Sequence, residues 1–130
     1  MSGAPLNLRR HPSAPAIADP AHDPRLDEGI ALFNAGEHWH AHEAWEPLWM
    51  GLEGDDKLFL QGLIMAAAML VQHGKGVRRG VENHWANVQF RLGGRPTRWG
   101  VDSARLLADL ERYRHDPALD AKAVRIRRLL

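Results

Sequence analysis

The sequence predicts an all-α protein: a compact bundle of about five helices packed around a buried central helix. Apolar residues recur at helical spacing along most of the chain, and no alternating strand pattern of useful length appears. The stretch LFLQGLIMAAAMLV is apolar on nearly every side, which is typical of a helix surrounded by other helices. With 130 residues, 45% of them hydrophobic, the chain is long enough to bury one core.

The beginning of the chain differs in composition from the rest. Five of the eight prolines fall within the first 24 residues, and no apolar segment follows Arg9 and Arg10. This composition is typical of a flexible tail and is unlike a secretory signal. We therefore expect a tail over residues 1–23, followed by a single helical domain over residues 24–130.

Capping and turn residues predict the bounds of the first two helices. The first is expected over residues 24–35, because Asp23 can cap it and Gly36 can end it. The second is expected over residues 37–50 and contains Pro47. Proline lacks the backbone N–H and crowds the carbonyl four residues before it, so we expect the second helix to bend or break there and to leave that carbonyl free.

Three further helices follow. The central, buried helix is expected over residues 55–73. It is too short, and too interrupted by Gln61, to cross a bilayer, which takes about 20 apolar residues. Two helices with one apolar stripe each are expected over residues 77–92 and 102–114. A short basic helix is expected after Pro117.

The segment over residues 33–49, FNAGEHWHAHEAWEPLW, holds three histidines, three tryptophans and three glutamates within a predicted helix. Buried imidazole and carboxylate groups need partners, so this mixture predicts a site. At about 100° per residue, one helix face gathers five of these side chains: His38, His42, Trp45, Glu46 and Trp49. Glu43 falls just beyond this face, and His40 falls on the opposite side.

Histidine beside a carboxylate supports three kinds of chemistry. The carboxylate can orient the imidazole for acid–base catalysis, with His42, Glu43 and Glu46 as the candidate catalytic residues. The pair His42 and Glu46 can bind a divalent metal such as zinc, iron or manganese, although no cofactor follows from the sequence alone. The same groups can also form a purely structural polar network. The HExxH motif of zinc proteases is absent.

Gln61 is the second indication of a site. A lone amide in an apolar helix needs a partner, and the polar face of the preceding helix can supply one. We expect His42, Glu46 and Gln61 to lie in one hydrogen-bond or coordination network, walled by Trp45 and Trp49, with His40 outside it. The candidate ligand-binding residues are His38, Trp45, Trp49 and Gln61.

Charge and composition limit the choice of partners. Residues 1–74 hold 4 basic and 10 acidic side chains, whereas residues 75–130 hold 13 basic and 6 acidic ones. Two faces that attract each other, or a symmetric homo-oligomer, explain this asymmetry. An acidic ligand or nucleic acid is the alternative, but the basic residues do not form an aromatic-interleaved stripe. The chain has no cysteine, which excludes thiolate metal sites and fits a reducing compartment. We expect a cytoplasmic protein without a membrane partner.

The two blocks FNAGEHWHAHEAWEPLW and LFLQGLIMAAAMLVQHGKG, followed by a helix ending in a leucine and RP, resemble the domain of unknown function 309 family of small all-helical proteins. The resemblance covers roughly residues 25–96. It implies a compact helical fold in which the two blocks face each other. It also implies five signature positions: His42, Glu43, Glu46, Trp49 and Gln61. The family has no established activity, so the resemblance implies no substrate.

Three functional hypotheses follow from the sequence. The first is a protein that binds a small ligand or metal at the His/Glu/Gln cluster between the second and third helices, with hydrolase-like catalysis left open. The second is a structural or protein-interaction module whose cluster only locks the helices together. The third is an anion or nucleic-acid binder that uses the basic second half.

Overall fold

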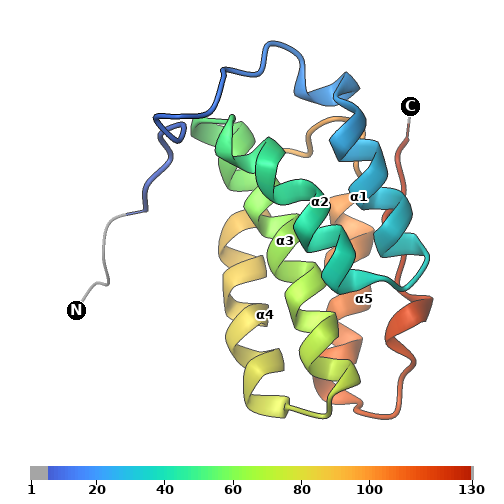
Figure 1. The fold of residues 1–130 in the computed structure, drawn as a ribbon. Helices are drawn as coiled ribbons and strands as arrows, with labels where there is room; N and C mark the ends of the chain where they lie inside the picture. Colours follow the sequence, from blue (N-terminus) through green and yellow to red (C-terminus); the bar gives the residue numbers. More distant parts are fainter. Residues whose placement is uncertain (1–5, 130) are drawn as a thin grey trace.

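The computed structural model describes residues 6–129, which fold into five α-helices and two three-residue 3-10 helices (Figure 1). The all-α prediction is confirmed. The first five residues of the predicted tail, and Leu130, lie outside the described residues. The elements are, in order, η1 (Pro20–His22), α1 (Pro24–Asn34), α2 (His38–Met50), α3 (Gly54–Gly74), α4 (Arg78–Leu92), α5 (Ser103–His115) and η2 (Ala121–Ala123).

Helix α3 is the centre of the bundle. It lies between α2 and α4, while α1 packs against α2 and α5 packs against α4 (Figure 1). Twelve residues of α3 are buried, against four in each of the other α-helices, so the predicted central helix is confirmed. Within residues 6–129, no helix has both the length and the apolarity needed to cross a membrane.

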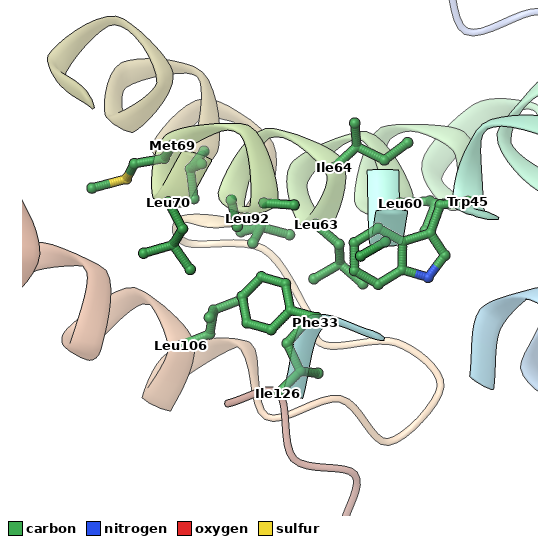
Figure 2. Packing of buried hydrophobic residues seen from close by; sticks show 14 of the residues in the cluster. Phe33, Trp45, Leu60, Leu63, Ile64, Met69, Leu70, Leu92, Leu106 and Ile126 are labelled. Carbon is green, nitrogen blue, oxygen red and sulfur yellow. The ribbon is translucent and has the colours of Figure 1, made fainter. Parts of the chain in front are cut away.

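The core joins all five helices and the C-terminal segment (Figure 2). Trp45 is its largest fully buried side chain, and its indole Nε1 donates a hydrogen bond to the Leu26 carbonyl at 3.2 Å. The indole lies directly against Gly29, where an added Cβ would come within 1.9 Å of Nε1. Glycine is therefore required on α1 for α2 to bury this tryptophan.

Helix α2 continues through Pro47 and ends at Met50, so the predicted break at this proline is wrong. The tertiary contacts of the following turn explain the continuation. Leu48 is fully buried, and the Met50 carbonyl accepts a hydrogen bond from the His11 N–H at 2.8 Å. The bend at Pro47 stays a prediction. Among the described side chains, none donates to the carbonyl of Glu43.

The proline-rich segment before α1 lies against the corner where α2 ends and α3 begins (Figure 1). The Gly54 N–H donates to the Leu8 carbonyl at 2.7 Å, and the Lys57 ammonium donates to the Arg9 carbonyl. Pro20 is buried. The backbone of this segment therefore lies over the Lys57 side chain and helps to bury it.

The expected basic helix after Pro117 is only the single 3-10 turn η2, and an extended segment follows it. One isolated antiparallel bridge, between Val101 and Arg128, is the only β pairing within residues 6–129. Arg98 pairs with Asp56 at 2.9 Å, and Arg128 pairs with Asp27. These contacts join the basic second half of the chain to its acidic first half.

Candidate functional site

A cavity of about 170 Å³ lies between α2 and α3. It brings together four of the predicted site residues. The positions on α2 are four and three residues apart, which places their side chains along one stripe of the helix. The lining side chains are His42, Glu46 and Trp49 from α2, and Gln61, Ile64 and Met65 from α3.

The polar side chains of this cavity do not bond to one another. Nε2 of His42 lies 3.9 Å from Oε2 of Glu46, which is beyond hydrogen-bond distance. The Gln61 amide makes no hydrogen bond to His42 or Glu46 in the part of the chain that the structure describes. The predicted hydrogen bonds among these side chains are therefore absent from the described structure, because the side chains line an open space instead of packing against each other. Coordination of a shared metal stays a prediction.

Two nitrogen atoms at this cavity are buried without a partner. Within residues 6–129, neither Nδ1 of His42 nor Nε1 of Trp49 has a hydrogen-bond partner. Leaving such a group unpaired costs about 1–3 kcal/mol, so the fold holds these two groups at an energetic cost. In native proteins, unsatisfied groups of this kind call for an explanation, and a functional site is one.

The charges around the cavity are unbalanced. The Glu46 side chain is more than half exposed. Among the described residues, His42 is the only basic side chain that forms a close pair with its carboxylate, with Nε2 3.9 Å from Oε2. Lys57 approaches the Trp49 ring, with Nζ 4.2 Å from the ring centroid, but it lines no part of the cavity. Burial lowers the pKa of Lys57, and the Arg9 carbonyl accepts from its ammonium. The carboxylate of Glu46 is thus the main charge facing the cavity.

A second cavity, of about 260 Å³, adjoins the first and reaches α4. His42 and Met65 line both cavities. The rings of His42 and Trp39 stack with their centroids 5.3 Å apart and an interplanar angle of 17°. Besides the two shared residues, the second cavity is lined by Trp39, Ala68, Val71, Gln72 and His84.

Ala68 and His84 were not among the predicted site residues. The spacing of 61, 65, 68 and 72 along α3 follows one helical stripe, which places Ala68 beside Met65. His84 comes from α4 across the bundle, so its place at this cavity depends on tertiary packing. Burial lowers its pKa, and its Nδ1 has no hydrogen-bond partner in the described structure.

Three predicted site residues lie away from both cavities. Trp45 belongs to the core, where it is fully buried. Glu43 is exposed, and its Oε1 lies 3.2 Å from Nδ1 of His40, which is outside the site as expected. His38 is buried at the other end of α2, edge-on to Phe33 with centroids 5.0 Å apart. It lines a separate cavity of about 460 Å³.

The structure also bears on the predicted metal. Among residues 6–129, no group of three or more His, Asp or Glu side chains is close enough to hold a metal ion. His42 and Glu46 provide two donors on one helix. A metal bound there would need further ligands from the Gln61 amide or from solvent.

These features define a five-helix all-α domain with two adjacent cavities on the face formed by α2, α3 and α4. Residues 26–84 match the model of the family described as Domain of unknown function (DUF309), so the predicted family is confirmed. The matched segment ends earlier than the 25–96 expected from the sequence, but it contains every residue that lines the two cavities. Comparisons with curated proteins and with solved structures gave no match.

Proposed function

We propose that this protein binds a small polar organic molecule in the cavity between α2 and α3. One observation carries the proposal. His42, Glu46 and Gln61, from two helices, converge on one cavity without bonding to each other. Each side chain therefore keeps donors or acceptors available to a bound molecule.

The alternative is a structural cluster that only locks α2 to α3. Such a cluster works through hydrogen bonds that join the two helices, since buried polar groups stabilise a fold only when they are paired. Among the described side chains, Asn34 is an example. Its Nδ2 donates to the Ile126 carbonyl at 2.9 Å, and its Oδ1 accepts from the Ile126 N–H at 2.7 Å. Within residues 6–129 the Gln61 amide has no comparable bond, which favours ligand binding over a structural lock.

The size and lining of the cavity favour a compact organic ligand. An apolar cavity of about 150 Å³ is large enough to hold benzene, and this cavity has a similar volume of about 170 Å³. Ile64 and Met65 offer apolar contact beside the polar groups. Small-molecule sites combine such apolar walls with a few converging polar side chains.

A metal site and a hydrolase-like site are less well supported. The described residues offer a metal only two His or carboxylate donors here, whereas protein zinc sites use at least three. In a hydrolase, His42 would act as general base and Glu46 would orient its ring. Orienting the ring requires a hydrogen bond between the two side chains, and Nε2 of His42 lies 3.9 Å from Oε2 of Glu46, beyond hydrogen-bond distance.

Nuclear magnetic resonance of the ¹⁵N-labelled protein tests the proposal. Methylamine, acetamide, acetate and zinc ion are titrated separately while the tryptophan indole and glutamine amide signals are followed. We expect at least one of the three organic probes to shift the Trp49 indole and Gln61 amide signals saturably. The Trp45 indole signal should stay in place, because its N–H is bonded to the Leu26 carbonyl.

Two matched variants control this experiment. Gln61→Met keeps the side-chain size and removes the amide, so it should weaken binding of the active probe. Gln89→Met makes the same change at an exposed position on α4 that lines neither cavity, and it should bind as the parent does. The absence of a saturable shift with every organic probe would overturn the proposal, and a shift with zinc alone would assign a metal site instead.

A further inference from the structure

The two adjacent cavities indicate the chemical class of the ligand, on the assumption that the proposed function holds. We propose that the ligand is a primary amine attached to an aromatic body. The ammonium group occupies the cavity beside Glu46 and Gln61, and the ring occupies the neighbouring cavity beside Trp39 and Ala68. The cavity between α2 and α3 is called the head cavity below, and the one that reaches α4 is called the tail cavity.

The head and tail cavities lie next to each other. His42 and Met65 line both of them, so a ligand that extends past these two side chains would contact both cavities. On α3 the next residue of this stripe is Ala68, whose small side chain leaves room beside Met65. The tail cavity measures about 260 Å³, which exceeds the volume of about 150 Å³ that accommodates benzene.

The head cavity matches a primary ammonium group. An ammonium has three N–H donors and no acceptor. The cavity offers three acceptors: the Glu46 carboxylate, the Gln61 carbonyl oxygen, and Nε2 of His42 when Nδ1 carries the proton. Glu46 adds a negative charge, and no Lys or Arg within residues 6–129 forms an ion pair with it. A cation therefore forms an ion pair with the carboxylate as well as a charge-assisted hydrogen bond, whereas a neutral donor forms only the hydrogen bond and an anion is repelled.

The tail cavity matches an aromatic ring. Trp39 is 58% exposed and lines the tail cavity, with its ring stacked on that of His42. An exposed tryptophan held in place by a stacked neighbour offers a rigid apolar surface, and aromatic rings pack on such surfaces in offset or edge-on geometry. Met65 and Val71 provide the remaining apolar walls.

Chemical shift titration of the ¹⁵N-labelled full chain tests the assignment with four probes. 2-Phenylethylamine has both the ammonium group and the aromatic ring, whereas methylamine has only the ammonium group. 2-Phenylethanol has the ring with a neutral hydroxyl group, and phenylacetate has the ring with a negative carboxylate. We expect 2-phenylethylamine to shift both the Trp49 and Trp39 indole signals and to bind several-fold more tightly than 2-phenylethanol, because only the ammonium forms an ion pair with the partly exposed Glu46. Methylamine should shift the Trp49 signal and leave Trp39 unchanged.

Two pairs of variants separate the head from the tail. Glu46→Gln should remove the preference for the amine over the alcohol, whereas Glu43→Gln, at an exposed position outside both cavities, should keep it. Ala68→Leu should fill the tail cavity. It should weaken the binding of 2-phenylethylamine about tenfold and leave the binding of methylamine unchanged. Ala86→Leu places the same side chain at an exposed position on α4 and should leave the binding of both amines unchanged.

Each alternative result has a definite meaning. Binding of 2-phenylethanol or phenylacetate as tight as that of 2-phenylethylamine would overturn the ammonium assignment and leave the proposed function standing. Equal binding of methylamine and 2-phenylethylamine would overturn the tail assignment. If acetamide or acetate shifts the Trp49 signal and neither amine does, the ligand class is wrong although the site is right. If no organic probe shifts Trp49, the proposed function itself fails.

Discussion

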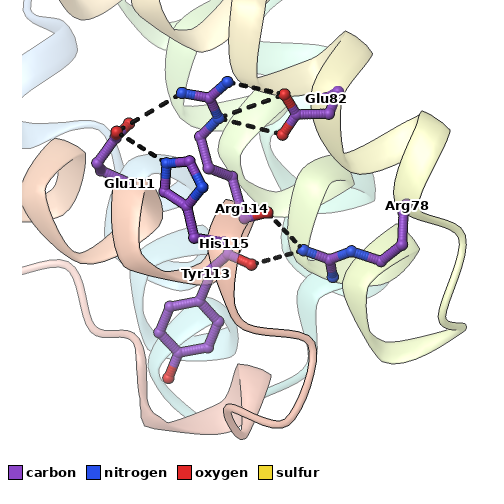
Figure 3. A network of polar contacts seen from close by, with 6 residues as sticks. All are labelled: Arg78, Glu82, Glu111, Tyr113, Arg114 and His115. Atoms are coloured by element: carbon purple, nitrogen blue, oxygen red, sulfur yellow. Dashed lines mark hydrogen bonds and ion pairs between the residues drawn. The ribbon is translucent and has the colours of Figure 1, made fainter.

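The guanidinium of Arg78 donates from Nη1 to Nδ1 of His73 at 2.9 Å. Since a guanidinium can only donate, Nδ1 must be the acceptor, and Nε2 of His73 carries the proton that it donates to the Leu119 carbonyl at 2.6 Å. Nη2 of Arg78 also donates to the carbonyls of Tyr113 and Arg114, each at 2.8 Å (Figure 3). One side chain thus joins the end of α3, the start of α4 and the last turn of α5.

Replacing this arginine should weaken the whole bundle. Arg78→Met leaves three acceptors short of a partner, and we expect the free energy of unfolding to fall by about 1–3 kcal/mol. Urea unfolding followed by circular dichroism measures the change. Arg79→Met, at the exposed neighbouring position, is the control and should stay within about 0.5 kcal/mol of the parent. Equal stability of the two variants would contradict the role given to Arg78.

Two glycine substitutions should have opposite effects. Gly29→Ala places a Cβ 1.9 Å from Nε1 of Trp45, so the core must shift. Overpacking of this kind lowers stability by about 1–3 kcal/mol. Gly74→Ala, in the last turn of α3, meets no atom within 4 Å and should raise stability by about 0.5–1 kcal/mol. Thermal unfolding of both variants tests this, and a Gly29→Ala protein as stable as the parent would refute the close packing of Trp45.

Buried His38 should make stability depend on pH. Burial lowers the pKa of His38 below its usual 6.5, so the folded state binds fewer protons than the unfolded chain. This contribution to stability is present above about pH 6.5 and is lost as the pH falls toward the lower pKa of the folded state. We expect His38→Leu to flatten the decline in melting temperature between about pH 7 and pH 5.

A core substitution without a titratable group controls for the change in packing at His38. Ile30→Val lowers stability by about 0.5–1.5 kcal/mol and should leave the slope against pH as it is in the parent. Ile30 is buried on α1, so the substitution disturbs the same core. If the melting temperatures of His38→Leu and Ile30→Val fall to the same extent between about pH 7 and pH 5, the titration of His38 is not the cause of the pH dependence.

Gln61 and Asn34 should respond differently to loss of their amides. Asn34→Leu removes two hydrogen bonds to Ile126 and leaves buried backbone groups unpaired, so stability should fall by about 1–3 kcal/mol. Gln61→Met removes an amide that forms no hydrogen bond with His42 or Glu46, and the unliganded protein should keep its stability or gain slightly. Urea unfolding without added ligand compares them. A comparable loss in Gln61→Met would support the structural alternative.

Much of the architecture was predictable because its causes are local. The residues around Asp23 and Gly36 signal a helix start and a helix end, and α1 follows them within one residue. The all-round apolar pattern of α3 identified the central helix, since only a helix covered on every side can bury such a sequence. The spacing of His42, Glu46 and Trp49 placed them on one stripe of α2 before any neighbour was known.

The five α-helices, the central position of α3 and the candidate side chains that share a face of α2 all follow from local sequence patterns. Which of those side chains border a cavity depends on how the helices pack together. Trp45 and Trp49 are one turn apart on the same face of α2. Trp45 packs against Gly29 of α1 in the core, whereas Trp49 borders the cavity beside Gln61. Helical periodicity sets the direction of a side chain from its own helix, whereas its burial and its partners depend on residues that other helices bring to it.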